Sequence, residues 1–187
     1  IAKPIIQDPI GISKRKIQSF FASPDILRLD LKYKDYMKLM HTLEKVRESK
    51  TSYGVDNEWV NADLQNKNIS YRAKIRLKGA TAGEHAGDKW SFKLKLKDQK
   101  TIHGMREFAV MSPVRRNYLG MWFIRKVYEK EGIISRKYDF INLIINGEDK
   151  GIYVMDERYD KIMLERNHRK EEPVIKIDQT PLFVDKV

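Results

Sequence analysis

The chain of 187 residues is long enough for one domain with a hydrophobic core, and its 41% hydrophobic and 34% charged residues are typical of a soluble globular protein. No apolar run approaches the roughly 20 residues that span a bilayer, so we expect no transmembrane segment. The net charge of +11 favours anionic partners, and the absence of cysteine excludes disulfides, thiolate metal sites and cysteine nucleophiles.

The N-terminal residues 1–24 contain three prolines and no sustained hydrophobic period. This composition predicts an extended arm, with a possible short helix near residues 14–21, ahead of a single domain over residues 25–187. Because the chain begins at Ile1, we expect a trimmed N-terminus from which any signal peptide has been removed.

Two elements are predicted before the centre of the chain. Residues 26–31 alternate between apolar and polar side chains, which indicates a strand. The next segment predicts a helix, because five apolar side chains fall on one helical face and would pack on the core. A short strand is expected over residues 59–64. The helical stripe consists of Tyr36, Leu39, Met40, Leu43 and Val46.

Residues 69–97 form the most regular part of the sequence. Residues 69–78 and 90–97 both alternate with period two, which predicts two paired strands that share an apolar underside. Their upper face would carry seven cations and no acid. Like charges opposed across two strands repel, and a bound polyphosphate would relieve that repulsion. A solvated outer face is the alternative reading.

The loop between these strands holds three glycines within residues 79–87. Its backbone N–H groups could close on a phosphate, with Thr81 adding a hydroxyl. The loop matches neither the G-x-G-x-x-G nor the Walker pattern, so alone it is a weak signal.

A further strand is expected within residues 104–111, and Ser112-Pro113 then reads as an N-cap followed by proline at the first helical position. The predicted helix runs to about Glu131 and stops at Gly132. Its expected core stripe consists of Leu119, Trp122, Phe123 and Val127.

A second hairpin is predicted from residues 138–145, the turn Asn146-Gly147 and residues 151–155. Asp156 or Glu157 would then cap a helix reaching His168, and residues 174–177 would form a last short strand. These elements together predict an α+β fold in which a mostly antiparallel sheet packs against two or more helices.

The order of four blocks resembles the CotH kinase-like family, named for spore coat protein H. The blocks are residues 75–81, residues 89–96, a helix opened by Arg116-Asn117 and ended by Glu131-Gly132, and the run from Asn146-Gly147 to Glu157. The last block looks like the family signature N-G-x-x-x-G-x-Y-x-x-x-E. The likeness covers about residues 25–178 and implies a fold resembling the N-terminal region of an atypical protein kinase.

The resemblance implies an ATP-dependent kinase of serine and threonine on coat, surface or exported proteins, with ATP and Mg²⁺ as cofactors and an extracytoplasmic, cell-surface or spore-coat location. On that reading the segment from Arg76 to Thr81 and its loop cover the phosphates, and Lys93 or Lys95 on the facing strand supplies a point charge on the α- and β-phosphates. Tyr153 and Glu157 belong to the hairpin that leads to the adenine edge. The phosphate-covering residues would be Arg76, Lys78, Gly79 and Thr81.

Two departures from the family pattern bear on catalysis. No carboxylate stands near the helix start at Ser112, where the family usually has an Asp. The family places its catalytic and metal-binding acids downstream of the hairpin, so we expect a truncated nucleotide-binding part and assign neither catalytic nor metal-binding residues here. The nearby acids are read as caps and surface ion pairs: Asp156, Glu157, Asp160 and Asp178.

The four histidines are read as surface residues, because none pairs with another histidine or an acid at metal-ligand spacing. Two other functions stay open. One is a non-catalytic CotH-like surface or coat assembly module. The other is a polyanion-binding domain suggested by net charge alone; no nucleic acid is expected, since aromatic side chains do not interleave with the cations.

Overall fold

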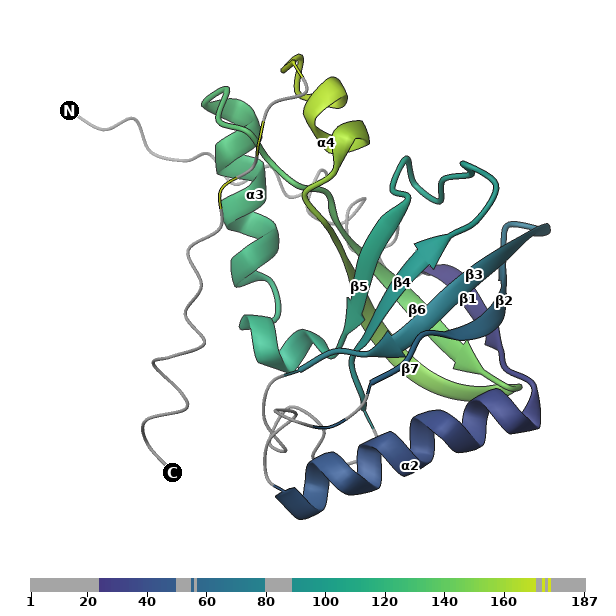
Figure 1. Cartoon of the computed structure of the whole chain (residues 1–187). Helices are drawn as coiled ribbons and strands as arrows, with labels where there is room; N and C mark the ends of the chain where they lie inside the picture. Colours follow the sequence, from purple (N-terminus) through teal and green to yellow (C-terminus); the bar gives the residue numbers. More distant parts are fainter. Residues whose placement is uncertain are drawn as a thin grey trace, which may run out of the picture.

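The structure is a computed structural model that describes residues 24–49, 55, 57–79, 89–170, 173 and 175. Within these residues the strands form a closed barrel in the order β1-β2-β3-β4-β5-β7-β6 (Figure 1). The strands are β1 (Asp25–Asp30), β2 (Val60–Asn66), β3 (Ile69–Leu77), β4 (Phe92–Leu96), β5 (Glu107–Met111), β6 (Tyr138–Ile145) and β7 (Glu148–Glu157).

The predicted α+β fold, a sheet packed against two or more helices, is wrong because the sheet closes on itself. Strand β1 completes the barrel: Leu27 lies opposite Asn66 in antiparallel β2 and opposite Leu143 in parallel β6. A barrel leaves no free sheet edge. Alternation in residues 26–31 reveals a strand, but it does not reveal that the strand has a neighbour on both sides.

The hydrophobic core fills the barrel interior. Period-two alternation points every second side chain inward, and the largest fully buried ones include Tyr153, Phe92 and Phe108. A barrel of about this size is just wide enough for side chains to fill it. Side chains therefore fill the interior, and we expect any ligand-binding site on the outer surface of the barrel.

Helix α2 (Tyr33–Ser49) crosses one end of the barrel, next to β2 and β3 (Figure 1). Leu39, Leu43 and Val46 are buried, and Tyr36 and Met40 pack at the edge of the core. This confirms the predicted helix and its apolar stripe.

The single helix predicted after Ser112 is instead two pieces. Pro113–Arg116 form the 3₁₀-helix η2, and Asn117 and Tyr118 then adopt left-handed backbone angles, with φ of 52° and 48°. Helix α3 (Gly120–Lys130) begins only after this break, because a left-handed residue cannot continue a right-handed helix. The side chain of Ser112 makes no capping hydrogen bond.

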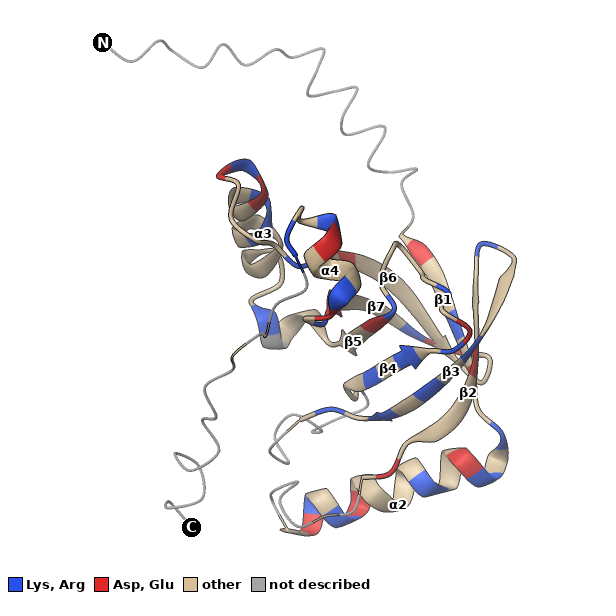
Figure 2. Ribbon diagram, turned by 45° about the horizontal axis from the view of Figure 1, so that its top comes forward, with Lys and Arg blue, Asp and Glu red and all other residues tan. Residues whose placement is uncertain are grey.

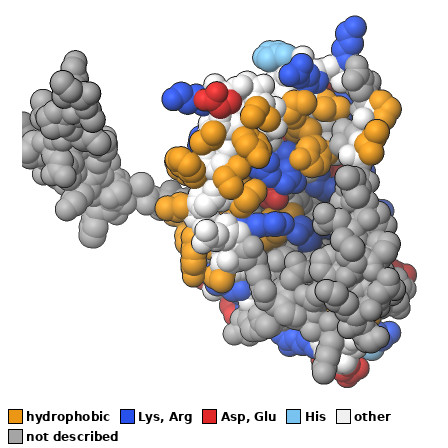
Figure 3. All heavy atoms as spheres, turned by 90° about the vertical axis from the view of Figure 1, so that its left-hand side faces the viewer, with side chains coloured by type: hydrophobic (Ala, Val, Ile, Leu, Met, Phe, Trp, Pro, Cys, Tyr) orange, Lys and Arg blue, Asp and Glu red, His pale blue; other side chains and the backbone are white. Residues whose placement is uncertain are grey.

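The core stripe predicted for this helix is also wrong. Leu119 and Phe123 are 64% and 62% exposed, and the buried residue of α3 is Arg125. Figure 3 shows hydrophobic side chains gathered around Lys and Arg on this side of the molecule. The helix therefore packs on the barrel through Arg125 and the partly buried Met121, and it leaves much of its apolar surface exposed.

The second hairpin forms as predicted, with a longer return strand. Asn146 and Gly147 have φ of 48° and 84°, the positive pair typical of a type I′ turn. Asp156 and Glu157 belong to β7 and do not cap a helix, contrary to prediction. The cap of α4 (Lys161–Arg166) is Asp160, whose Oδ1 accepts from the Met163 backbone N–H at 2.9 Å.

Three expectations lie wholly or almost wholly outside the described residues. They are the arm over residues 1–24, the loop that follows Gly79, and the last strand at residues 174–177.

Candidate functional site

Strands β3 and β4 pair as the sequence predicts. Lys74 lies opposite Lys95, and Arg76 lies opposite Lys93, while the alternate side chains of both strands are buried in the barrel. Figure 2 shows the Lys and Arg residues spaced along both strands. The predicted hairpin with an apolar underside and a cationic outer face is confirmed.

A pocket of about 680 Å³ lies on this outer face; we call it the cationic pocket. Six of its side chains are basic and two are acidic, which leaves a surplus of positive charge. The residues that line the pocket come from the segment before β2, from β3 and β4, from the start of β5 and from the position after β7. Its lining consists of Trp59, Lys74, Arg76, Lys95, Leu96, Lys97, Asp98, Arg106, Glu107 and Arg158.

The two acids of the cationic pocket are already bound to cations. Glu107 contacts Lys95 at 2.7 Å and Arg158 at 3.4 Å. Asp98 contacts Arg72 at 2.9 Å. The hairpin itself lacks acids, but its neighbours supply them, so the repulsion between opposed cations is relieved only in part.

Two guanidinium groups of the cationic pocket retain hydrogen-bonding capacity. The Nε atoms of Arg76 and Arg106 are buried and have no hydrogen-bond partner within the described part of the chain. The guanidinium of Arg76 also lies 4.7 Å from the ring centre of Trp59, a cation–π contact that holds it in place. Buried N–H groups of this kind gain most from an oxyanion acceptor.

The structure places the predicted phosphate-binding residues along the same hairpin. Arg76 and Lys95 line the cationic pocket. Lys93 stands one position along, between Arg76 and Ala109 in the strand register. Lys78 and Gly79 follow the end of β3, where the Lys78 N–H donates to the Ser91 carbonyl at 2.8 Å. The predicted ligand Thr81 lies outside the described residues.

Tyr153 and Glu157 are not brought to the cationic pocket. Both are fully buried, Tyr153 within the barrel core and Glu157 at the end of β7. The Glu157 carboxylate accepts hydrogen bonds from Arg166 and, at 2.8 Å, from the Lys137 backbone N–H. Their roles at an adenine edge stay predictions.

Several residues of the pocket were missed from the sequence. Trp59, Arg106, Glu107 and Arg158 join it only through the strand order β3-β4-β5-β7 and through the chain entering β2. Glu107 opens a predicted strand, but periodicity does not say that this strand lies beside β4. Its pairing with Lys95 therefore had no signal in the sequence.

The reading of the histidines as surface residues is wrong for His103, whose side chain is mostly buried between two acids. Its Nε2 lies 2.9 Å from Asp25 Oδ2 and its Nδ1 lies 3.1 Å from Asp139 Oδ2. The hydrogen bond with Asp139 is the main cause that raises the pKa of His103 above its ordinary value. This bridge joins β1, the turn before β5, and β6.

Among the described residues, no group of three His, Asp or Glu side chains could hold a metal ion. The helices in this part of the chain are too short or too polar to cross a membrane.

The chain matches the model of a known protein family, and no curated protein matches it. The matching family is described as CotH kinase protein, and its model covers residues 75–183, more than half of the chain. The match begins near the end of β3 and includes β4 and all later described elements, and so takes in most of the cationic pocket. The chain therefore belongs to the CotH kinase protein family.

Proposed function

We propose that this chain binds the triphosphate of ATP in the cationic pocket, as the nucleotide-binding part of a CotH-type kinase of serine and threonine in coat, surface or exported proteins. The proposal rests on like charges that lie opposite each other on paired strands beside a pocket of about 680 Å³. The opposed pairs are Lys74 with Lys95 and Arg76 with Lys93. A polyphosphate would neutralise this charge. An extracytoplasmic or spore-coat location belongs to the same proposal.

The residues of the pocket would act by position and charge. Arg76 and Arg106 would donate from Nε to phosphate oxygens, and Lys74 and Lys95 would act as point charges. Bound ATP with its Mg²⁺ would supply the phosphoryl group for transfer. Because Asp98 and Glu107 are paired with cations, the phosphate oxygens of ATP and water molecules would provide most ligands of Mg²⁺.

The first experiment measures binding of Mg·ATP, Mg·ADP and AMP to the full chain by calorimetry. Affinity should rise with the number of phosphates, because each adds charge for the lysines and arginines. Arg76→Met and Lys95→Met should each weaken ATP binding roughly tenfold or more, since a hydrogen bond to a charged group is worth about 1.5–3 kcal/mol. Lys34→Met, an exposed lysine on α2, is the matched control.

Absence of binding at millimolar nucleotide would remove the proposal. Phosphate transfer from labelled ATP to serine or threonine of a coat or surface protein then separates a kinase from a chain that only binds. Transfer should be lost in the double variant Lys93→Met/Lys95→Met, which also removes the lysine that stands outside the pocket lining.

A non-catalytic CotH-like assembly module is the second candidate. It is favoured by Asp98 and Glu107, whose pairing with cations leaves neither acid of the pocket ready to orient a hydroxyl or a metal. This candidate requires partner binding that survives Lys93→Met/Lys95→Met. General polyanion binding would instead show affinity that falls steeply with salt and does not distinguish ATP from other polyanions.

A further inference from the structure

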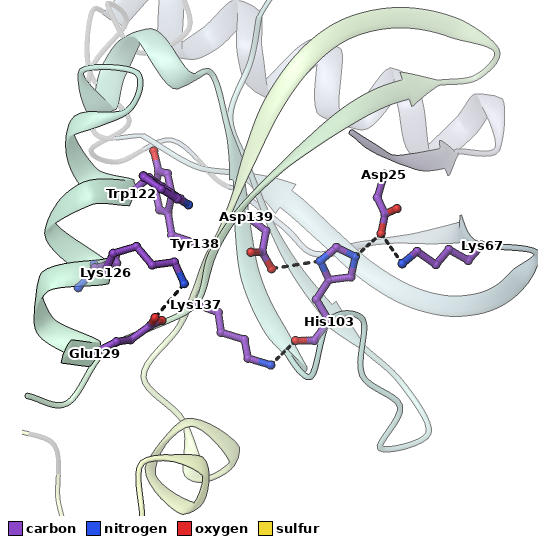
Figure 4. Close-up of a pocket in the computed structure, with 10 residues that line it drawn as sticks. Asp25, Lys67, His103, Trp122, Lys126, Glu129, Lys137, Tyr138 and Asp139 are labelled. Carbon is purple, nitrogen blue, oxygen red and sulfur yellow. Dashed lines mark hydrogen bonds and ion pairs between the residues drawn. The ribbon is translucent and has the colours of Figure 1, made fainter. Parts of the chain in front are cut away.

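A second pocket, of about 370 Å³, opens between α3 and the start of β6 and shares no lining residue with the cationic pocket. We call it the α3 pocket. Figure 4 shows Trp122 and Lys126 of α3 on one wall and His103, Asp139 and Asp25 on the other. Arg125 and Tyr138 also line it.

Two donors in the lining of the α3 pocket are buried without a hydrogen-bond acceptor. Arg125 is 7% exposed and Tyr138 is 4% exposed. The Nε of Arg125 and the hydroxyl of Tyr138 have no hydrogen-bond partner in the described chain. Buried donors are normally satisfied, so an unpaired pair beside one cavity indicates that an acceptor belongs there.

The charge behind Arg125 is not balanced. Its nearest carboxylate is that of Asp156, at 3.9 Å, and the same carboxylate lies 3.4 Å from Arg136. Two guanidinium groups therefore share one buried acid. Burial first, and then the charge of Arg136, lower the pKa of Arg125. An additional anion would offset both effects.

The acids that line the α3 pocket do not cancel this surplus, because each is already paired. Asp25 contacts Lys67 at 2.8 Å and His103 at 2.9 Å, and Glu129 contacts Lys126 at 2.8 Å. Asp139 contacts the other nitrogen of His103 at 3.1 Å.

Lys137 adds a further positive charge to the lining, and after the hydrogen bond with His103 this charge also helps to lower the pKa of Asp139. Its ammonium donates to the His103 carbonyl oxygen at 2.6 Å, and that acceptor is neutral. An ammonium has three donors, so it can bind an anion as well. The side chains of Arg125, Lys137 and Tyr138 thus all line one cavity, together with the indole of Trp122.

We propose that the α3 pocket binds a phosphate monoester carried on a serine or threonine side chain of a partner protein, held by Arg125, Lys137 and Tyr138. A dianionic phosphate matches the unbalanced positive charge, and its tetrahedral oxygens can meet donors from several directions. The binding does not depend on the nucleotide site. Free inorganic phosphate shares this chemistry, so the experiment compares the two sources.

The test uses the full ¹⁵N-labelled chain and follows the indole N–H signal of Trp122 by NMR. The probes are a phosphoserine peptide, the same peptide with serine, and inorganic phosphate. We expect saturable binding of the phosphopeptide, at least tenfold tighter than the serine peptide, with inorganic phosphate shifting the same signal more weakly. If inorganic phosphate binds as tightly as the phosphopeptide, or if no probe saturates, the proposal is wrong.

Variants locate the binding. Tyr138→Phe keeps the ring and removes the unpaired hydroxyl, and Lys137→Met removes the ammonium; each should weaken phosphopeptide binding about tenfold. Arg125→Met tests the third donor, but it also leaves Asp156 with one partner fewer. Lys130→Met removes an exposed lysine from α3 that does not line the pocket and should change binding little.

Thermal unfolding confirms that each variant is folded. Wild-type phosphopeptide affinity in both folded Tyr138→Phe and folded Lys137→Met would overturn the proposal. Lys95→Met separates the two sites, because it should weaken ATP binding and leave phosphopeptide binding unchanged. Failure at one pocket is thereby distinguished from failure at the other.

Discussion

The guanidinium of Arg166 in α4 donates from both Nη atoms to the two carboxylate oxygens of Glu157 at the end of β7. Glu157 is fully buried, and Nη2 of Arg166 also donates to the Ser135 carbonyl at 3.2 Å. Together with the Lys137 N–H on the same carboxylate, this pair joins α4 to the barrel and to the segment after α3. Glu157 therefore has a structural role, whatever ligand the chain binds.

We expect Glu157→Gln to lower the free energy of unfolding by about 2–4 kcal/mol, since it leaves a cation facing a neutral group. The cost should stay below that of a fully buried unpaired ion, because the Arg166 side chain is 29% exposed. Urea denaturation measures the change. Glu165→Gln, whose pair with Lys161 on the same helix is more than half exposed, should change stability by under about 0.5 kcal/mol. Equal effects of the two substitutions would contradict the prediction.

The His103 bridge predicts a stability that depends on pH. The pKa of His103 is raised, chiefly by its hydrogen bond with Asp139, and that bond is also the main cause that lowers the pKa of Asp139. Lys67 first, and then His103, lower the pKa of Asp25. A raised histidine pKa stabilises the fold below the unfolded value of 6.5 and loses that effect as pH rises through the folded value.

The carboxylates act in the opposite sense: their contribution is present above the unfolded value of 3.8 and is lost as pH falls through the lowered folded value. The bridge should thus stabilise the protein most between about pH 4 and 6.5. Urea denaturation at pH 5.5 and 8.5 should show a stability difference in the wild type that shrinks in His103→Gln. His41→Gln, exposed on α2, should keep it; a difference that persists without His103 would sink the idea.

Two phenylalanines distinguish the observed core from the predicted one. Phe108 is fully buried in the barrel, whereas Phe123 is 62% exposed on α3. Phe108→Ala should cost about 3–5 kcal/mol, through lost burial and the cavity that remains. Phe123→Ala should cost under about 1 kcal/mol. Chemical denaturation of both variants decides the matter, and similar losses would mean that α3 buries the face expected from its sequence.

Hydrophobic periodicity in the sequence predicts most of the secondary structure. Alternation located β3 and β4, and the stripe through Leu39, Leu43 and Val46 located α2, because both periods are set by backbone geometry. The closure of the sheet into a barrel cannot be predicted from such local patterns. It depends on β1 pairing with β6, more than 100 residues later in the chain.

Helix α3 shows how hydrophobic periodicity misleads when a charged side chain is buried at the contact with the barrel. The sequence favoured Leu119, Phe123 and Val127 as the buried face, yet Arg125 turns inward toward Asp156. No periodic signal marks an arginine as buried, since its partner comes from a strand that follows later. The cationic face of the candidate site can be predicted, because it follows from the alternation of apolar and basic side chains within each strand and needs no knowledge of distant partners.

Glu107 offers a sharp test of the cationic pocket, because it is the acid that holds Lys95 and Arg158 on the outer face. Glu107→Gln removes a negative charge from the lining and releases both cations for a ligand. If the pocket binds a triphosphate, ATP affinity should rise by roughly 1.5- to 5-fold, the equivalent of about 0.2–1 kcal/mol for partly exposed pairs. Calorimetry at fixed ionic strength measures it. Glu44→Gln, which makes the same charge change on α2 at an exposed position, is the control. Weaker ATP binding in folded Glu107→Gln would mean that Glu107 itself contacts the nucleotide or its metal, and that the cations around it are not the groups that hold the phosphates.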